Sequence, residues 1–248
     1  MSKKAIVVMV LVGVAMVIAG TLFAQETGGV AAPKKSWFDL FKSTGLVGIL
    51  LLLLSIGGFS LVIEHMVSLR LEKIAPPDLV GQIDEALESG DTEKAYEACQ
   101  SRDVYLSRVV KAGLEAGGTG EVAMEAARET GGEEAFGLNT KISYLSLVGN
   151  IAPLLGLLGT VTGMISSFQT IETLKAPTPG DLAKGVYESL VNTTMGLFIA
   201  IVFLTVYFLF KNKVSKLCLS INLQAVDMLR HLAIAEKTGG GAGAASHG

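Results

Sequence analysis

The chain has 248 residues, of which half are hydrophobic and only 17% carry a charge. Its mean hydropathy of +0.52 excludes an ordinary water-soluble domain of this size and predicts a membrane protein. The formal net charge of -3 comes without a basic stripe, which argues against a nucleic-acid partner.

The first apolar stretch runs from Ala5 to Ala24 and follows the basic residues Lys3 and Lys4. A charged start followed by an apolar run is typical of a signal peptide, so we predict cleavage after Ala24; the alternative is an uncleaved signal anchor. The polar residues that follow, with Gly and Pro among them, are expected to form a linker outside the membrane.

Three further stretches are apolar and long enough to cross a hydrocarbon core about 30 Å thick as helices. With an exported N-terminus, the number of crossings places the mature N-terminus in the periplasm and the C-terminus in the cytoplasm. The basic residues beside the stretches agree with this orientation in part. The chain is therefore expected to be a multi-pass protein of the cell inner membrane.

The segment between the first two of these stretches carries the signals of a small cytoplasmic helical domain. Leu79, Ile83 and Leu87 recur at every fourth residue, and Asp91 is placed to start another helix. No strand-like alternation of useful length is present, so the predicted fold class is all-α, with long helices that extend from the membrane into this domain.

Two glycine pairs, Gly117-Gly118 and Gly131-Gly132, predict breaks between the helices of this domain. After the second pair, one long helix is expected to run into the membrane. The predicted boundaries are 1–24 for the signal peptide or anchor, 25–44 for a periplasmic linker, 45–70 for the first membrane helix, 71–141 for the cytoplasmic helical domain, 142–170 for the second membrane helix, 171–186 for a periplasmic loop, 187–211 for the third membrane helix, 212–236 for a cytoplasmic helix and 237–248 for a disordered tail.

The second and third membrane stretches each carry small residues along one side of a helix. Small residues allow helix backbones to approach closely, so we expect helix packing there and, through it, the association of copies of the chain. The expected helix-packing residues are Gly149, Pro153, Gly156, Gly163 and Gly196. Two explanations of these stripes stay open: close packing of the helices, and a pore that the stripes line.

Glu188 is different, because an ionisable residue within a membrane helix indicates a functional site. Together with Thr193, Asn192 and Thr160 it predicts a wetted ion pathway. The alternative for Glu188 is a carboxylate that reaches the outer membrane interface without any role in conduction.

No catalytic constellation accompanies these stripes, so we expect neither enzyme activity nor a cofactor. The histidines, His65, His231 and His247, have no Cys, Asp or Glu at the spacing of metal ligands and are expected to be surface or interface residues without a metal. Cys99 and Cys218 lie in segments assigned to the cytoplasm, where thiols stay reduced, and are expected to be packing residues.

Two sequence motifs carry a family resemblance. NIAPLLGLLGTVTGMISSF at 150–168 and GVYESLVNTTMGLFIAI at 185–201 resemble the MotA/TolQ/ExbB proton-channel family, most closely its ExbB members. The resemblance implies a homo-oligomeric ring, a pentamer in ExbB-like members, around the membrane helices of an ExbD/TolR-like partner. A TonB-like protein is a further implied partner.

The resemblance also assigns roles to residues of this chain. The family's glutamate at the start of its last membrane helix falls on Glu188, and its threonine five residues later falls on Thr193. Its other pore threonine falls on Ile151, a departure for which Thr160 or Asn150 could compensate.

Several functional alternatives stay open at this point. The chain could be an ExbB-like subunit that energises transport, a TolQ- or MotA-like stator of a different machine, or, in a different class, a self-contained small-molecule permease. Three membrane helices without a pair of broken half-helices offer a permease few binding groups.

Overall fold

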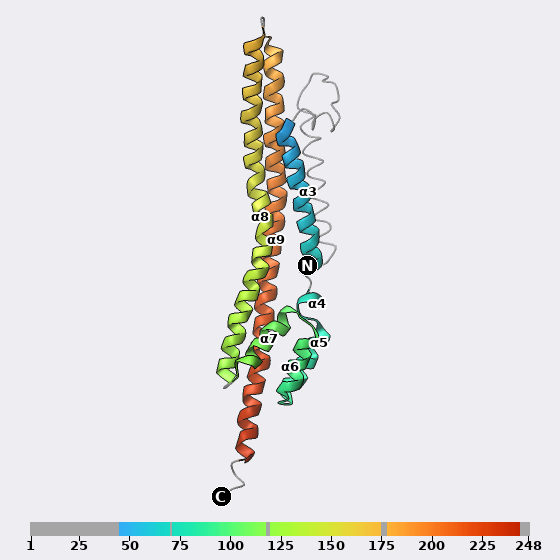
Figure 1. The fold of residues 1–248 in the computed structure, drawn as a ribbon, viewed down its shortest axis with the longest axis vertical. Coiled ribbons are helices and arrows are strands. Elements are labelled where there is room, and N and C mark those ends of the chain that lie inside the picture. Colours follow the sequence, from blue (N-terminus) through green and yellow to red (C-terminus); the bar gives the residue numbers. More distant parts are fainter. Residues whose placement is uncertain (1–44, 70, 118–119, 175–177, 244–248) are drawn as a thin grey trace. The chain divides into compact units, whose positions relative to one another are not determined.

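The computed structural model describes residues 45–69, 71–117, 120–174 and 178–243. Every regular element in these ranges is an α-helix, which confirms the predicted all-α fold class. The predicted signal peptide and periplasmic linker lie outside the described residues. Figure 1 shows the helices, which are α3 (Gly45–Ser68), α4 (Leu71–Ile74), α5 (Pro77–Glu88), α6 (Thr92–Ser101), α7 (Tyr105–Ala116), α8 (Gly120–Thr173) and α9 (Pro179–Gly243).

Three of the described helices contain segments long and apolar enough to cross a membrane, as predicted. These segments are Gly45–Ser68, Gly120–Thr173 and Gly185–Arg230. The two long helices, α8 and α9, each contribute to both of the compact units into which the chain divides. The predicted boundaries at 171–186 and 237–248 stay predictions; α9 itself extends from Pro179 to Gly243.

The first unit contains, among the described residues, 45–60 and 145–206 without the gap at 175–177. Here α3 packs on the other two helices through a core of Val47, Leu51 and Ala152. Phe203 of α9 is also fully buried and meets the ring of Phe59 edge-on, with the ring centroids 5.3 Å apart. This core holds the three predicted membrane segments together.

The second unit contains the described residues from 61 to 144 and from 207 to 243. In α5, the predicted periodic residues Leu79, Ile83 and Leu87 are all fully buried. Asp91 caps α6, as predicted, because its side chain accepts a hydrogen bond from the Lys94 N–H at 3.1 Å. The short helices thus form a domain with its own apolar core.

Tyr105 joins α7 to both long helices in the second unit. Its hydroxyl lies 2.8 Å from the Gly131 carbonyl oxygen of α8 and 2.9 Å from Oδ1 of Asn222 in α9, so its single proton can be donated to either acceptor. Burial raises the pKa of this hydroxyl well above its usual range, so it stays a neutral donor. On the exposed side of α7, Arg108 binds Glu134 of α8 with two hydrogen bonds, of 2.6 and 2.9 Å.

The predicted break at Gly131-Gly132 is wrong, because α8 continues through both residues. Gly131 instead allows a close approach between helices: a Cβ at this position would lie 2.5 Å from Oδ1 of Asn222. Gly117, by contrast, ends α7 as predicted and has a φ of 60°, which favours glycine.

Two further predictions concern single side chains of the second unit. His65 was expected at a surface or interface, but it is only 5% exposed and its Nδ1 donates a 2.7 Å hydrogen bond to the Leu61 carbonyl. Cys99 and Cys218 are free and buried, which confirms them as packing residues. Burial raises the pKa of the Cys99 thiol to about 11, so the thiol is protonated at neutral pH.

Candidate ion pathway in the membrane helices

In the first unit, α8 and α9 meet along a seam in which glycine on one helix faces a small polar residue on the other. A Cβ on Gly163 would collide with the Ser189 hydroxyl, and one on Gly185 would collide with the Ser167 hydroxyl. Both serines are buried, and each donates a 2.8 Å hydrogen bond to a carbonyl of its own helix. The hydroxyls therefore fill the space that the glycines leave, with their hydrogen bonds satisfied.

Further along this seam the two backbones touch. A Cβ on Gly196 would lie 2.5 Å from the Ala152 carbonyl oxygen and 3.0 Å from the Gly156 Cα. Backbone atoms cannot rotate away as a flexible side chain can, so both glycines are required by the helix contact.

These contacts correct the expectation that the small-residue stripes bring copies of the chain together, because the stripes contact each other within one chain. Gly149 belongs to the same contact, since a Cβ there would lie 2.6 Å from the Leu204 side chain. Pro153 is half-buried within α8, which continues past it. The five residues keep their predicted role in helix packing as candidates.

Asn192 lies inside the seam and is only 4% exposed. Its amide packs over Gly159, where a Cβ would lie 2.7 Å from the Asn192 Cβ and 2.9 Å from its Nδ2. Its Oδ1 has no hydrogen-bond partner among the described residues. Asn192 is therefore placed to pack the helices and not to line an open surface of the single chain.

Thr193 links the two helices by a hydrogen bond. Its Oγ1 donates to the Gly156 carbonyl of α8 at 3.1 Å, and the side chain is partly exposed. Since the one hydroxyl proton is used in this bond, Thr193 presents only lone pairs to its surroundings. Thr160 also presents only lone pairs, because its hydroxyl donates its proton at 2.7 Å to the Leu157 carbonyl of its own helix. Both hydroxyls are therefore acceptors for a cation, a water or a protonated acid.

Glu188 lies on α9 immediately before the buried Ser189 and is itself partly exposed. It makes no ion pair or hydrogen bond with the described residues, so the structure does not join it to Thr193, Asn192 or Thr160 in one network. The four predicted pathway residues thus divide into a packed amide, two acceptor hydroxyls and a separate carboxylate.

Two features of this arrangement were not predicted. Gly159 was not singled out, although it stands three residues after Gly156 and four before Gly163, the spacing of the seam itself. The acceptor of the Thr193 hydroxyl could not be inferred at all, because it depends on how α9 is positioned along α8.

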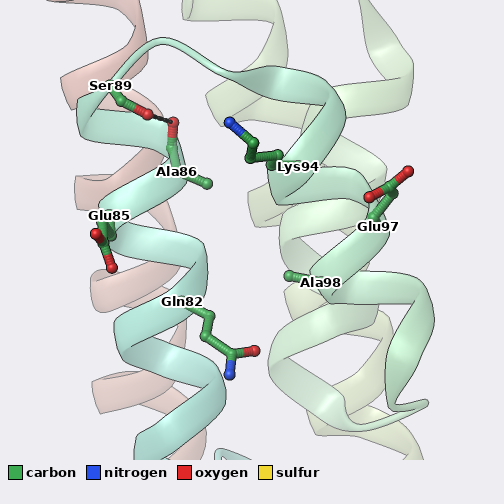
Figure 2. Close-up of a pocket in the computed structure, with 7 residues that line it drawn as sticks. All are labelled: Gln82, Glu85, Ala86, Ser89, Lys94, Glu97 and Ala98. Atoms are coloured by element: carbon green, nitrogen blue, oxygen red, sulfur yellow. Dashed lines mark hydrogen bonds between the residues drawn. The ribbon is translucent and has the colours of Figure 1, made fainter.

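A groove on the second unit is the other candidate for a site. It lies between α5 and α6, and Figure 2 shows its lining. Ser89 donates its hydroxyl proton to the Ala86 carbonyl at 2.9 Å, so this serine has no base that would make it a nucleophile. The described residues also contain no cluster of three His, Cys, Asp or Glu side chains able to hold a metal. The lining residues are Gln82, Glu85, Ala86, Ser89, Lys94, Glu97 and Ala98.

Comparisons with known proteins show that the chain is similar to a family of membrane channels. Residues 101–222 match the model of the MotA/TolQ/ExbB proton channel family. A biopolymer transport protein ExbB homolog of Methanothermobacter thermautotrophicus is 26% identical over 68% of this chain and 61% of its own length. The biopolymer transport protein exbB1 of Vibrio cholerae is 41% identical over 28% of this chain and 31% of its own length.

Other relatives of the family appear as well. The Tol-Pal system protein TolQ of Pseudomonas aeruginosa is 39% identical over 26% of this chain and 28% of its own length. These matches therefore span less than two thirds of each relative. A C. jejuni MotAB structure shares the fold with a TM-score of 0.58, at 15% identity, over 94% of this chain and 90% of that chain. The family model and the relatives agree that the chain is similar to the MotA/TolQ/ExbB proton channel family.

Proposed function

We propose that this chain is the ExbB-like subunit of an inner-membrane motor driven by the proton-motive force. The observation that carries the proposal is the hydroxyl of Thr193 beside the α8–α9 seam. Its proton is donated to the Gly156 carbonyl, so its oxygen can only accept further hydrogen bonds. With Glu188 near the start of the same membrane segment, it provides groups that attract a cation or a protonated acid. The chain itself acts as no enzyme and uses no cofactor.

The proposed pathway needs a partner chain. In the described membrane part of the first unit, the carboxylates are Glu172 and Glu188, near the end of α8 and the start of α9. A proton that crosses about 30 Å of hydrocarbon needs a titratable group between the two water phases. An ExbD/TolR-like chain with an Asp on its single membrane helix would supply this group and dock inside a ring of copies, proposed to be a pentamer.

The relatives bear on the load that the motor drives. An ExbB-like motor would energise protein or nutrient transport, with a TonB-like protein as a further partner, whereas TolQ- and MotA-like stators drive other machines. The matches to ExbB relatives over more of the chain favour the first.

Ion flux in liposomes tests the proposed function. The chain alone should leave liposomes tight to protons, because it lacks the central titratable group, and addition of the ExbD/TolR-like partner should produce proton uptake under an imposed potential. Fast proton leak with the chain alone would contradict the proposal. Replacement of external sodium by potassium, at constant pH, identifies the ion: flux that persists indicates protons.

The proposed orientation is tested by single cysteines on the native background, since both native thiols are buried. A Thr178→Cys label in the loop between α8 and α9 should react with a membrane-impermeant maleimide in intact cells with a permeable outer membrane. A Glu97→Cys label on α6 should react only after the inner membrane is opened. Reaction of position 97 from outside would show that the proposed orientation is wrong.

A further inference from the structure

Ser146 and Asn150 of α8 form a polar pair in the first unit that the described chain does not cover. Asn150 is exposed, and Ser146 is half-buried. The pair belongs to the predicted membrane helix 142–170, and Asn150 lies about 12 Å from its start at about 1.5 Å per residue. An amide is costly against lipid, which offers it no hydrogen bonds, so it is expected to face another protein group or a water-filled cavity.

The hydrogen bonds of this pair leave one acceptor and one donor free. The Asn150 Nδ2 donates to the Ser146 carbonyl oxygen at 2.7 Å and to the Ser146 Oγ at 3.2 Å. Because the carbonyl oxygen can only accept, the atom that faces it is the amide nitrogen and not Oδ1. Among the described residues, no group donates to the Asn150 Oδ1 and none accepts the proton of the Ser146 hydroxyl. The pair therefore presents an amide oxygen beside a hydroxyl donor.

This arrangement is complementary to a carboxylic acid. The acid O–H can donate to the Asn150 Oδ1 while the acid carbonyl oxygen accepts from the Ser146 O–H. After loss of its proton, the carboxylate keeps the bond from Ser146, and hydrogen bonds to ionised groups are the stronger ones. The hydroxyls of Thr193 and Thr160 differ, since both present only lone pairs and can receive the protonated acid but not the carboxylate.

On α8, the pair and Thr160 lie on the side of the α9 contact that faces away from α3. Gly149 and Gly156 contact α9. At about 100° per residue, Asn150 lies about 100° round α8 from Gly149, and Thr160 lies about 40° round from Gly156 in the same sense. Leu155, which packs against the core that α3 shares, lies about 100° round from Gly156 in the opposite sense.

Thr193 of α9 lies on the same side of the helix pair. It is about 60° round α9 from Gly196, which contacts α8. Met195 and Ile199, which pack against the core that α3 shares, lie about 100° and about 60° round from Gly196 in the opposite sense. Since α8 and α9 run antiparallel, rotation in the same sense on each leads to the same side. Thr193 therefore faces the same space as the polar residues of α8.

An apolar stretch separates the two levels of polar groups on this side. Gly159 meets Asn192 across the seam, so the neighbouring Thr160 and Thr193 lie at nearly one level. Asn150 lies about 14 Å from Gly159 along α8, toward the cytoplasm in the proposed orientation. Between these levels the side is apolar: Leu157 is 58% exposed and Leu197 is 50% exposed. A proton needs a carrier to cross this stretch.

From these observations we infer that Ser146 and Asn150 bind the carboxylic acid of the partner's membrane helix where it releases its proton. The acid is protonated beside the lone pairs of Thr193 and carries its proton past the apolar stretch. At the Ser146–Asn150 pair it gives the proton to water on the cytoplasmic side, which leaves a carboxylate that accepts a hydrogen bond from Ser146. This inference rests on the proposed function, which supplies the partner and its acid.

Proton flux in liposomes that contain the chain and its ExbD/TolR-like partner is the first test. Ser146→Ala should reduce the flux on the order of 10- to 100-fold, the loss of one hydrogen bond to an ionised group, and Asn150→Leu on the order of tenfold. Ser146→Thr should keep most of the flux, because it keeps the hydroxyl. Thr162→Val is the matched control, since this exposed hydroxyl donates at 2.9 Å to the Leu158 carbonyl of its own helix.

Photo-cross-linking provides a readout that does not use ion flux. With benzoylphenylalanine in place of Asn150, ultraviolet light should join the chain to its partner, whereas the same probe in place of Ile49, which is 53% exposed on α3, should not. A probe at position 150 that captures only lipid or a second copy of the chain would overturn the inference, as would full flux in both Ser146→Ala and Asn150→Leu. A wild-type complex that does not conduct would instead contradict the proposed function, and capture at position 150 would still decide whether the pair meets the partner.

Discussion

Glu188→Ala and Thr193→Val are each expected to abolish most proton-driven work while the complex stays assembled. Thr193 is the only hydroxyl found to bond from α9 to α8 within the described membrane part, and Glu188 the only carboxylate near the start of the described α9 membrane segment. Loss of one charge-assisted contact in the ion path, worth about 1.5–3 kcal/mol, corresponds to a fall in flux on the order of 10- to 100-fold.

Two matched controls sharpen this prediction. Thr194→Val removes the neighbouring hydroxyl, which is exposed and donates at 3.0 Å to the Leu190 carbonyl of its own helix. Glu172→Ala removes an exposed carboxylate near the end of α8. Both controls should keep the wild-type flux in liposomes that contain the partner. Full activity of both test variants, with size-exclusion profiles unchanged, would place the ion path elsewhere.

The membrane helices could be predicted from sequence because their signal is local. An apolar run of sufficient length has few alternatives to a membrane-spanning helix, and all three expected spans are found. The same holds for α5 and for the Asp91 cap of α6, where periodicity and capping act within a few residues. The glycine pair at 131 misled the prediction, because glycine serves both helix ends and close helix contacts, and only the neighbour, Asn222, distinguishes them.

The candidate site was predictable only in part, for a related reason. The spacing of Gly156, Gly163 and Gly196 indicated that these faces pack, but spacing cannot say whether the partner helix belongs to the same chain or to another copy. The answer depends on the register of α8 against α9, which also decides that Asn192 packs on Gly159 and that Thr193 bonds to Gly156. Register is a property of the pair, so no pattern within one helix reveals it.

The intrachain seam leads to the last prediction, that Gly196→Ala destabilises the chain itself. The added Cβ would lie 2.5 Å from the Ala152 carbonyl oxygen, a backbone atom that only a shift of the whole helix can move. Overpacking of this kind lowers the free energy of unfolding by about 1–3 kcal/mol, which outweighs the gain of up to about 1 kcal/mol in helix propensity from Gly to Ala.

Gly57→Ala on α3 is the matched control, because nothing lies within 4 Å of a Cβ at that position. It should keep or raise the thermal midpoint in detergent, since only the gain in helix propensity applies there. The midpoint of Gly196→Ala should fall by several degrees, at about 2–4 °C per kcal/mol for a chain of this size. This loss should also appear in dispersed monomers, because the contact lies within one chain. A variant that unfolds like the wild type but no longer forms oligomers would show that the seam joins copies after all.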